Sequence, residues 1–320
     1  MRLSAFTALT VATTFLLAAC GGEQTASSPS EGAHQSASQP AEQTSASATP
    51  SPTPTPEELP GGGQEVFDGK RYIALYGAPG RPSLGVLGEQ DAPASVARVQ
   101  ELVDQYQPHA TETVVPAFEV IVTTASSAPG VDGDYSDAAL IEDIEPLIKE
   151  AYENDVYVVI DFQPGHSDFL SQVRLYEDLL KYPNVGVGLD PEWRLAPGQV
   201  HLQQIGSVTA AEINDTLDYL ADFTRKNDLP QKMVVLHQFT HTMISNRETI
   251  TVTHPELALT LHADGHGSPE LKVDTYNSLL TGLNKEIYPS WKNFYDEDTP
   301  TMTPAQTYEL DPKPWVVTYQ

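Results

Sequence analysis

The sequence predicts an α/β fold, a (β/α)8 barrel of the TIM type, from three observations. Apolar runs of strand length recur along the chain, segments with helical periodicity separate them, and polar residues follow nearly every run. Runs that are apolar on both faces and alternate with helices are typical of a parallel sheet covered by helices. No Gly-x-Gly-x-x-Gly motif follows the first run, which disfavours an open sheet that binds a dinucleotide.

The apolar runs predict seven clear strands and one weak strand. The clear strands cover residues 72–76, 114–122, 156–162, 185–189, 233–239, 257–261 and 315–319. The weak strand lies between residues 287 and 294, a region rich in Pro, Asp and Lys. We therefore expect a TIM-like barrel that is irregular around its seventh unit.

Helices are predicted over residues 96–106 and 140–151, where apolar residues repeat at helical spacing. A third helix begins at Thr209, because Thr209-Ala210-Ala211-Glu212 fits a capping box, and it ends near Asn227. Each helix lies between two predicted strands, as the barrel requires.

The N-terminus has the pattern of a secreted lipoprotein. Arg2 precedes an apolar run over residues 5–17, which is too short to span a membrane, and Leu17-Ala18-Ala19-Cys20 follows. This sequence resembles the bacterial lipobox, which implies that Cys20 is lipidated and becomes the first residue of the mature protein. We expect a signal peptide over residues 1–20 and a lipid anchor on the extracytoplasmic face of the cell membrane. Because Cys20 is the only cysteine, no disulfide is expected.

Residues 21–64 are predicted to form a disordered tether. They consist mostly of Ser, Thr, Ala, Pro, Gln and Glu, and lack the apolar residues needed to offset the entropy of ordering. The remaining residues, 65–320, have the length of one large barrel domain, which we expect to be a monomer. The formal net charge of −27 argues against nucleic acid and anionic lipid surfaces as partners.

Polar residues gather where the predicted strands end, which is where barrel enzymes carry their active sites. Side chains two apart on a strand point the same way, so several polar pairs are expected to face one cavity. The candidates, in strand order, are Glu119, then Asp161 and Gln163, then Asp190, Glu192 and Trp193, then His237 and Gln238, and finally His262 and Asp264.

Each candidate also has an ordinary structural explanation. Asp190 can cap the loop after its strand, Glu192 can be a solvated charge, His237 can be a satisfied core histidine, and Trp193 can belong to the core. A structural role for all of them together is disfavoured, because a buried carboxylate is costly unless it is paired.

A metal site and a cofactor are not expected. His237 and His241 are four residues apart, as are His262 and His266, but each pair runs from a strand into a loop, where this spacing carries little information. The chain has no His-Glu-x-x-His motif. If a metal bound nevertheless, the ligands to suspect would be Asp161, Asp190, His237 and Asp264.

Two resemblances follow from these motifs. Asp161-Phe162-Gln163-Pro164-Gly165, Leu189-Asp190-Pro191-Glu192-Trp193 and Leu236-His237-Gln238-Phe239 resemble a family of uncharacterised actinobacterial cell-surface lipoproteins. Asp190-Pro191-Glu192 is also similar to the Asp-x-Glu of chitinase-like TIM-barrel hydrolases, which implies that Glu192 is the general acid and Asp190 its partner. The chitinase motif has two further aspartates upstream, where this chain has Val185 and Gly188.

These observations predict a membrane-anchored, extracellular protein that resembles glycoside hydrolases and acts on a glycan of the envelope or the environment. Glycosidic cleavage needs a protonated acid and a second carboxylate, for which we expect Glu192 and either Asp161 or Asp264. The other candidates are expected to bind the substrate. The alternatives are a non-catalytic lipoprotein that binds a glycan or another envelope ligand, and a metal-dependent hydrolase.

Overall fold

The computed structural model describes residues 56–320. The predicted signal peptide, the predicted lipidation site Cys20 and most of the predicted tether lie outside the described residues. Within residues 56–320, none of the helices has the length and apolar content to cross a membrane.

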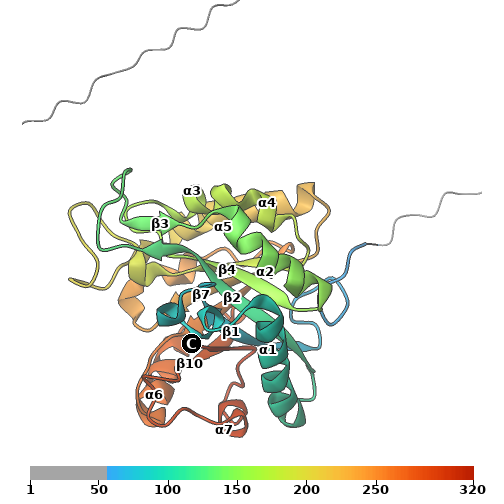
Figure 1. Cartoon of the computed structure of the whole chain (residues 1–320). Helices are drawn as coiled ribbons and strands as arrows, with labels where there is room; N and C mark the ends of the chain where they lie inside the picture. The colour runs from blue at the N-terminus through green and yellow to red at the C-terminus, as the bar shows by residue number, and fades with distance from the viewer. Residues whose placement is uncertain (1–55) are drawn as a thin grey trace, which may run out of the picture. The chain divides into compact units, whose positions relative to one another are not determined.

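The described residues form a closed barrel of eight parallel strands (Figure 1). The barrel closes because β1 pairs in parallel with both β2 and β11. Its strands are β1 (Lys70–Gly77), β2 (Thr113–Ala125), β4 (Tyr157–Phe162), β5 (Val185–Leu189), β7 (Lys232–Gln238), β9 (Leu257–Ala263), β10 (Tyr288–Asn293) and β11 (Val316–Tyr319). The predicted (β/α)8 fold is confirmed.

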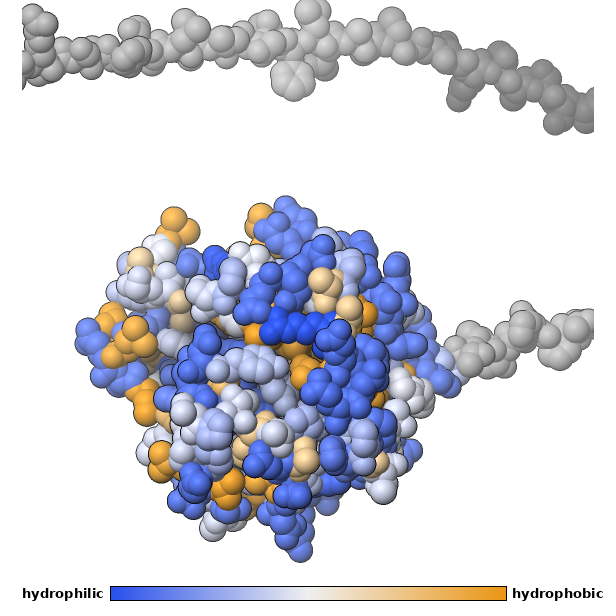
Figure 2. All heavy atoms as spheres, turned by 60° about the horizontal axis from the view of Figure 1, so that its bottom comes forward, coloured by the Kyte–Doolittle hydropathy of each residue, from blue (hydrophilic) through white to orange (hydrophobic). Residues whose placement is uncertain are grey.

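α-Helices lie between most successive barrel strands, though not between β7 and β9, and cover the outer side of the barrel. The helices are α1 (Ala92–Tyr106), α2 (Ile141–Glu153), α3 (Phe169–Val173), α4 (Glu177–Leu180), α5 (Ala210–Lys226), α6 (Pro269–Leu280) and α7 (Pro304–Tyr308). Three short strands lie outside the barrel: β3 (Ser136–Ala138), β6 (Val208–Thr209) and β8 (Ile244–Ser245). Apolar side chains of the longer helices and of the strands' outer faces form one continuous core. The face of the molecule in Figure 2 is mostly hydrophilic, as the acidic composition predicts.

The seventh β/α unit is irregular in the connection that follows β10, whereas β10 itself is a regular barrel strand. β10 pairs in parallel with both neighbours, so that Ser290 lies opposite His262 on one side and Val316 on the other. The segment between β10 and β11 contains only the five-residue helix α7. The apolar pattern of β10 is weak because Ser290 and Lys292, buried residues of this strand, are polar.

The interior of the barrel changes from apolar to polar along the strands. Side chains alternate across each strand, and the inward positions near the N-terminal ends are apolar. Phe67, Tyr72 and Tyr157 pack there with Leu59, a residue near the end of the predicted tether. Farther along the same strands the inward positions become polar, as at Glu119 on β2 and Asp161 on β4. This change places a polar layer at the C-terminal end of the barrel.

The start of α5 departs from the predicted capping box. The Thr209 hydroxyl accepts a hydrogen bond from the Glu212 backbone N–H, as expected of an N-cap. The Glu212 carboxylate, however, does not return to the cap, because it pairs with Arg194. Only half of the box forms, and its second residue instead fixes the loop that follows Trp193.

Candidate active site

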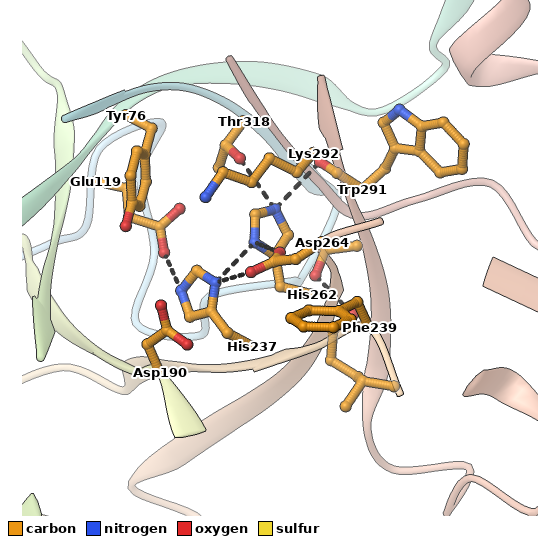
Figure 3. A network of polar contacts seen from close by, with 12 residues as sticks. Tyr76, Glu119, Asp190, His237, Phe239, His262, Asp264, Trp291, Lys292 and Thr318 are labelled. Carbon is orange, nitrogen blue, oxygen red and sulfur yellow. Dashed lines mark hydrogen bonds and ion pairs between the residues drawn. The ribbon is translucent and has the colours of Figure 1, made fainter. Parts of the chain in front are cut away.

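His237 lies at the centre of the polar layer, between two carboxylates (Figure 3). Its Nδ1 is 2.6 Å from Asp264 Oδ2 and its Nε2 is 2.8 Å from Glu119 Oε1. A carboxylate oxygen only accepts hydrogen bonds unless it is protonated, so both ring nitrogens donate and the imidazole is charged. Burial alone would lower the pKa of His237, but Asp264, Glu119 and Asp161 outweigh burial and raise it well above its usual value.

His262 extends this network toward β10 and β11. Its Nε2 is 3.1 Å from the Trp291 carbonyl oxygen and 3.0 Å from Thr318 Oγ1, so this nitrogen carries a proton and donates to the carbonyl. Its Nδ1 lies 2.9 Å from Asp264 Oδ1. Asp264 therefore faces two imidazoles, one with each carboxylate oxygen.

Asp161 and Tyr76 complete the buried layer on the opposite side of His237. The Tyr76 hydroxyl donates a hydrogen bond of 2.9 Å to Asp161 Oδ2, and Asp161 Oδ1 lies 3.5 Å from His237 Nε2. Burial raises the pKa of Asp161, and the neighbouring Glu119 charge adds to this effect, although His237 opposes it. Burial, with Asp161 next in effect, also raises the pKa of Tyr76.

A cavity of about 450 Å³ lies above this layer, at the C-terminal end of the barrel. Three of its lining residues come from the segment that the sequence singled out: Asp190, and Glu192 and Trp193 of the short 3-10 helix Pro191–Trp193. Asp190 Oδ1 accepts a 3.0 Å hydrogen bond from the Glu192 backbone N–H, so the first carboxyl group positions the second. Aromatic and polar side chains line the rest, among them Tyr76, Gln163, Phe239, Asp264, His266, Lys292 and Phe294.

The carboxyl groups of the cavity differ in their electrostatic surroundings. Burial raises the pKa of Glu192, Asp264 adds to this rise, and Lys292 and His237 oppose it. Burial also raises the pKa of Asp190 well above its usual range. For Asp264, burial is outweighed by His237, Lys292 and His262, which hold its pKa well below the usual range. The cavity thus combines carboxyl groups that favour the neutral form with one that favours the charged form.

The predicted site residues occupy two levels. Asp190, Glu192, Trp193, Gln163 and Asp264 line the cavity, whereas the buried layer beneath it contains Glu119, Asp161, His237 and His262. The convergence of these strand ends is as the sequence predicts. The roles assigned to the individual residues remain predictions.

Gln238 lies apart from the other candidates. Its side chain donates to the Thr240 carbonyl oxygen and accepts a hydrogen bond from Arg247, and it is not part of the cavity wall. The physical reason is strand alternation, because Gln238 follows His237 directly and so faces the other side of β7. We no longer expect Gln238 to contact the substrate.

Two residues of the site were not predicted from the sequence. Tyr76 ends an apolar strand and looks like a core residue, and Lys292 lies in the weak strand. The signal that could have revealed Lys292 is its charge, since a charged residue in a barrel strand is unusual without a role. Asp298, an acid of the segment after β10, does not reach the cavity: it is buried in an ion pair with Lys272 and accepts hydrogen bonds from the Phe294 and Gly267 backbone N–H groups.

The buried layer contains residue types that bind metals. Its hydrogen bonds, however, are better explained by protons on the histidine nitrogens than by a bound metal ion. Glu119, His237 and His262 come close enough to share an ion. A metal-binding imidazole needs a free lone pair, however, and both nitrogens of His237 donate to carboxylates. The imidazolium already supplies a cation between the Glu119 and Asp264 carboxylates, so no step of the proposal uses a metal.

Comparison with known proteins assigns this chain to no family. No protein-family profile matches the chain. No curated protein matches its sequence. Among solved structures, a D-allulose 3-epimerase from Methylomonas sp. with additional C-terminal residues is similar, with 11% identity and a TM-score of 0.36. The match covers 78% of this chain and 84% of that chain.

Proposed function

We propose that this protein is a carbohydrate-acting enzyme that cleaves a glycosidic bond in the cavity above His237. The observation that carries the proposal is the contrast between two carboxyl groups of that cavity. The pKa of Glu192 is raised, chiefly by burial, and that of Asp264 is lowered by its cationic neighbours despite burial. A neutral and an ionised carboxyl group in one site are the pair that glycoside hydrolysis requires.

In this proposal Glu192 is the general acid. It lines the cavity, and its backbone N–H is held by Asp190 Oδ1. Glu192 would donate its proton to the leaving-group oxygen as the glycosidic bond breaks. Asp190, which is 4% exposed and has a raised pKa, acts as a positioning residue for Glu192.

Asp264 is the second carboxylate of the proposal. Of the two residues that the sequence offered for this role, Asp264 lines the cavity, whereas Asp161 lies in the layer below and is fully buried. The charged His237 at 2.6 Å keeps Asp264 ionised. Asp264 would serve as base or nucleophile toward the sugar carbon, and the aromatic residues Trp193, Phe239 and Phe294 supply surfaces on which sugar rings stack.

Glu192→Gln tests the acid directly. The variant should lose about 10²- to 10⁴-fold in turnover of an unactivated glycan, since general acid catalysis contributes about that much. An aryl glycoside whose leaving group needs no proton should be hydrolysed nearly as fast as by the unchanged protein. Glu270→Gln, an exposed residue of α6, is the matched control and should leave both rates unchanged.

The substrate is found by screening a glycan panel with detection of products. Equal losses on both substrates in Glu192→Gln would show that Glu192 does not donate the proton. Binding of a glycan with no product after long incubation would contradict the proposal and favour the non-catalytic alternative.

We also propose that the enzyme is held at the cell surface by a lipid on Cys20, on the strength of the Leu17-Ala18-Ala19-Cys20 sequence. Metabolic labelling with a fatty acid should mark the unchanged protein and not Cys20→Ser. A labelled Cys20→Ser protein would contradict the anchor.

A further inference from the structure

Lys292 is a buried cation in the cavity wall without an oxygen partner. It is 4% exposed, and its Nζ lies 3.5 Å from the centroid of the Tyr76 ring, on the face of that ring (Figure 3). Its second aromatic neighbour is Phe294, whose centroid is 5.2 Å away. Across residues 56–320, no carboxylate, carbonyl or hydroxyl oxygen forms a hydrogen bond or ion pair with this ammonium.

The other buried lysines of the described chain all have oxygen partners. Lys272 donates to the Lys292 carbonyl oxygen and pairs with Asp298. Lys232 donates to the Val185 carbonyl oxygen at 2.7 Å, and Lys70 donates to the carbonyl oxygen of Gly62. Lys292 is therefore the exception, and its position in the cavity wall distinguishes it from the other three.

The carboxylates near Lys292 each face a histidine, although Glu119 Oε2 has no hydrogen-bond partner among the described residues. Asp264 faces His237 at 2.6 Å and His262 at 2.9 Å, and Glu119 faces His237 at 2.8 Å. Neither approaches Lys292 within the 4.0 Å of an ion pair. Glu192 also lines the cavity, and burial biases it toward its neutral form. Lys292 is thus the cation of the cavity wall that is left without a counter-ion in contact.

An ammonium group has three donors, and leaving them without acceptors in a buried site is unfavourable. The Tyr76 ring attracts the positive charge but does not accept three directed hydrogen bonds. The missing acceptors must come from what fills the cavity. An anionic oxygen group satisfies both the charge and the donors, whereas a neutral hydroxyl satisfies only the donors.

We propose that Lys292 binds the carboxylate of an acidic sugar, of the uronic acid type, in the cavity. This inference deepens the proposed function, because it names the class of glycan that the same site accepts. The ammonium would bind the carboxylate as a point charge, while Trp193 and Phe239 stack on the sugar ring.

Binding is measured in the Glu192→Gln background, so that the result does not depend on cleavage. The probes are an oligosaccharide that contains a uronic acid and the same oligosaccharide with its carboxyl group reduced to a primary alcohol. The parent should bind the acidic form about tenfold or more tightly, as a charge-assisted hydrogen bond implies. Added Lys292→Met should abolish this preference, and Lys292→Arg should retain part of it.

Lys285→Met is the matched control, because it removes the same charge from an exposed position ahead of β10. It should keep the preference for the acidic probe. Equal binding of the two probes by the parent, or an unchanged preference in Lys292→Met, would overturn the proposal. Tighter binding of a phosphorylated sugar than of the uronic acid would overturn the assignment to a carboxylate.

The two proposals fail separately. If the parent shows no preference for acidic probes but cleavage still depends on Glu192, only the role of Lys292 is refuted. Preference for acidic probes without any cleavage would refute only the hydrolase. A melting temperature of the Lys292→Met variant close to that of the parent shows that the binding result does not arise from unfolding.

Discussion

The side chain of Asp161 on β4 lies against the backbone of Gly188 on the neighbouring strand β5. They lie opposite each other in the register of β4 and β5. A Cβ at Gly188 would lie 2.8 Å from Asp161 Oδ1 and 3.2 Å from Asp161 Cβ. The chitinase resemblance places an aspartate at the position of Gly188, and here the neighbouring strand supplies an acid to that part of the barrel. Glycine is required at 188 because Asp161 fills the space that a side chain would need.

Gly188→Ala should therefore displace Asp161. We expect a loss of about 1–3 kcal/mol in the free energy of unfolding from overpacking, together with a loss of turnover and a changed pH profile. Gly186→Ala is the control, since its Cβ would meet the Met233 carbonyl oxygen and the Tyr157 hydroxyl, away from Asp161. Denaturant titration and kinetics on both variants decide the point. A changed pH profile in Gly186→Ala as well would show that overpacking alone, and not Asp161, is responsible.

Much of the fold was predictable because the hydrophobic pattern of each strand reports its own burial. β5 and β9 are apolar at nearly every position, and their bounds agree with the sequence to within two residues. β10 is different, since its buried positions include Ser290, whose hydroxyl is hydrogen-bonded, and Lys292, whose ammonium lies over the Tyr76 ring in the cavity wall. The pattern of residues along one strand cannot show how other parts of the fold accommodate a buried polar side chain.

The candidate site was predictable as a set of strand ends but not as a network. That His237 joins Glu119, 118 residues earlier, and Asp264, 27 residues later, depends on the order in which strands meet around the barrel. Whether a residue lies in the buried layer or lines the cavity depends on how far along its strand it lies. Alternation along β7 was readable, and it already placed Gln238 opposite to His237.

The proposed glycosidase activity should fall as pH rises through the pKa of Glu192. In the proposal Glu192 acts in its protonated form, and burial raises its pKa, so the falling limb should lie above the usual value of about 4.3 for glutamic acid. Lys292 opposes this rise, so Lys292→Met should move the limb to higher pH. The pH dependence of kcat/KM on an uncharged, unactivated glycan, whose leaving group needs the proton, measures it. A limb that moves to lower pH in Lys292→Met would contradict the electrostatic account.

The stability of the protein should decrease from mildly acidic to alkaline pH. The folded-state pKa of Asp190 is raised, so folding favours its neutral form, and stability is lost as pH rises from the unfolded pKa through the folded one. The raised pKa of His237 acts in the same direction, because its charged form is lost at higher pH. Asp190→Asn should flatten the dependence of the melting temperature on pH above the unfolded-state pKa of about 3.9. The exposed Asp104→Asn should not, and equal slopes in all three proteins would exclude Asp190 as the cause.

Chelation should leave activity and melting temperature unchanged. His237 donates from both ring nitrogens and has no lone pair for a metal. Elemental analysis of the purified protein, before and after treatment with a chelator, tests this. About one equivalent of a transition metal whose removal lowers the melting temperature would show that a metal replaces the proton on His237.

Arg194 should be needed for binding through its hold on the loop after Trp193. Its Nε and a terminal nitrogen donate to the two Glu212 oxygens at 2.8 and 3.3 Å, and its other terminal nitrogen donates to the Leu195 carbonyl oxygen at 2.6 Å. Lysine cannot reproduce this planar set of contacts. Arg194→Lys should therefore weaken glycan binding while changing the melting temperature little, because the pair is partly solvated. Glu212→Gln should cause a smaller loss of the same kind, as it keeps one acceptor for Arg194. If Arg194→Lys binds glycan as tightly as the unchanged protein, the loop does not depend on this pair and Trp193 is positioned by the barrel alone.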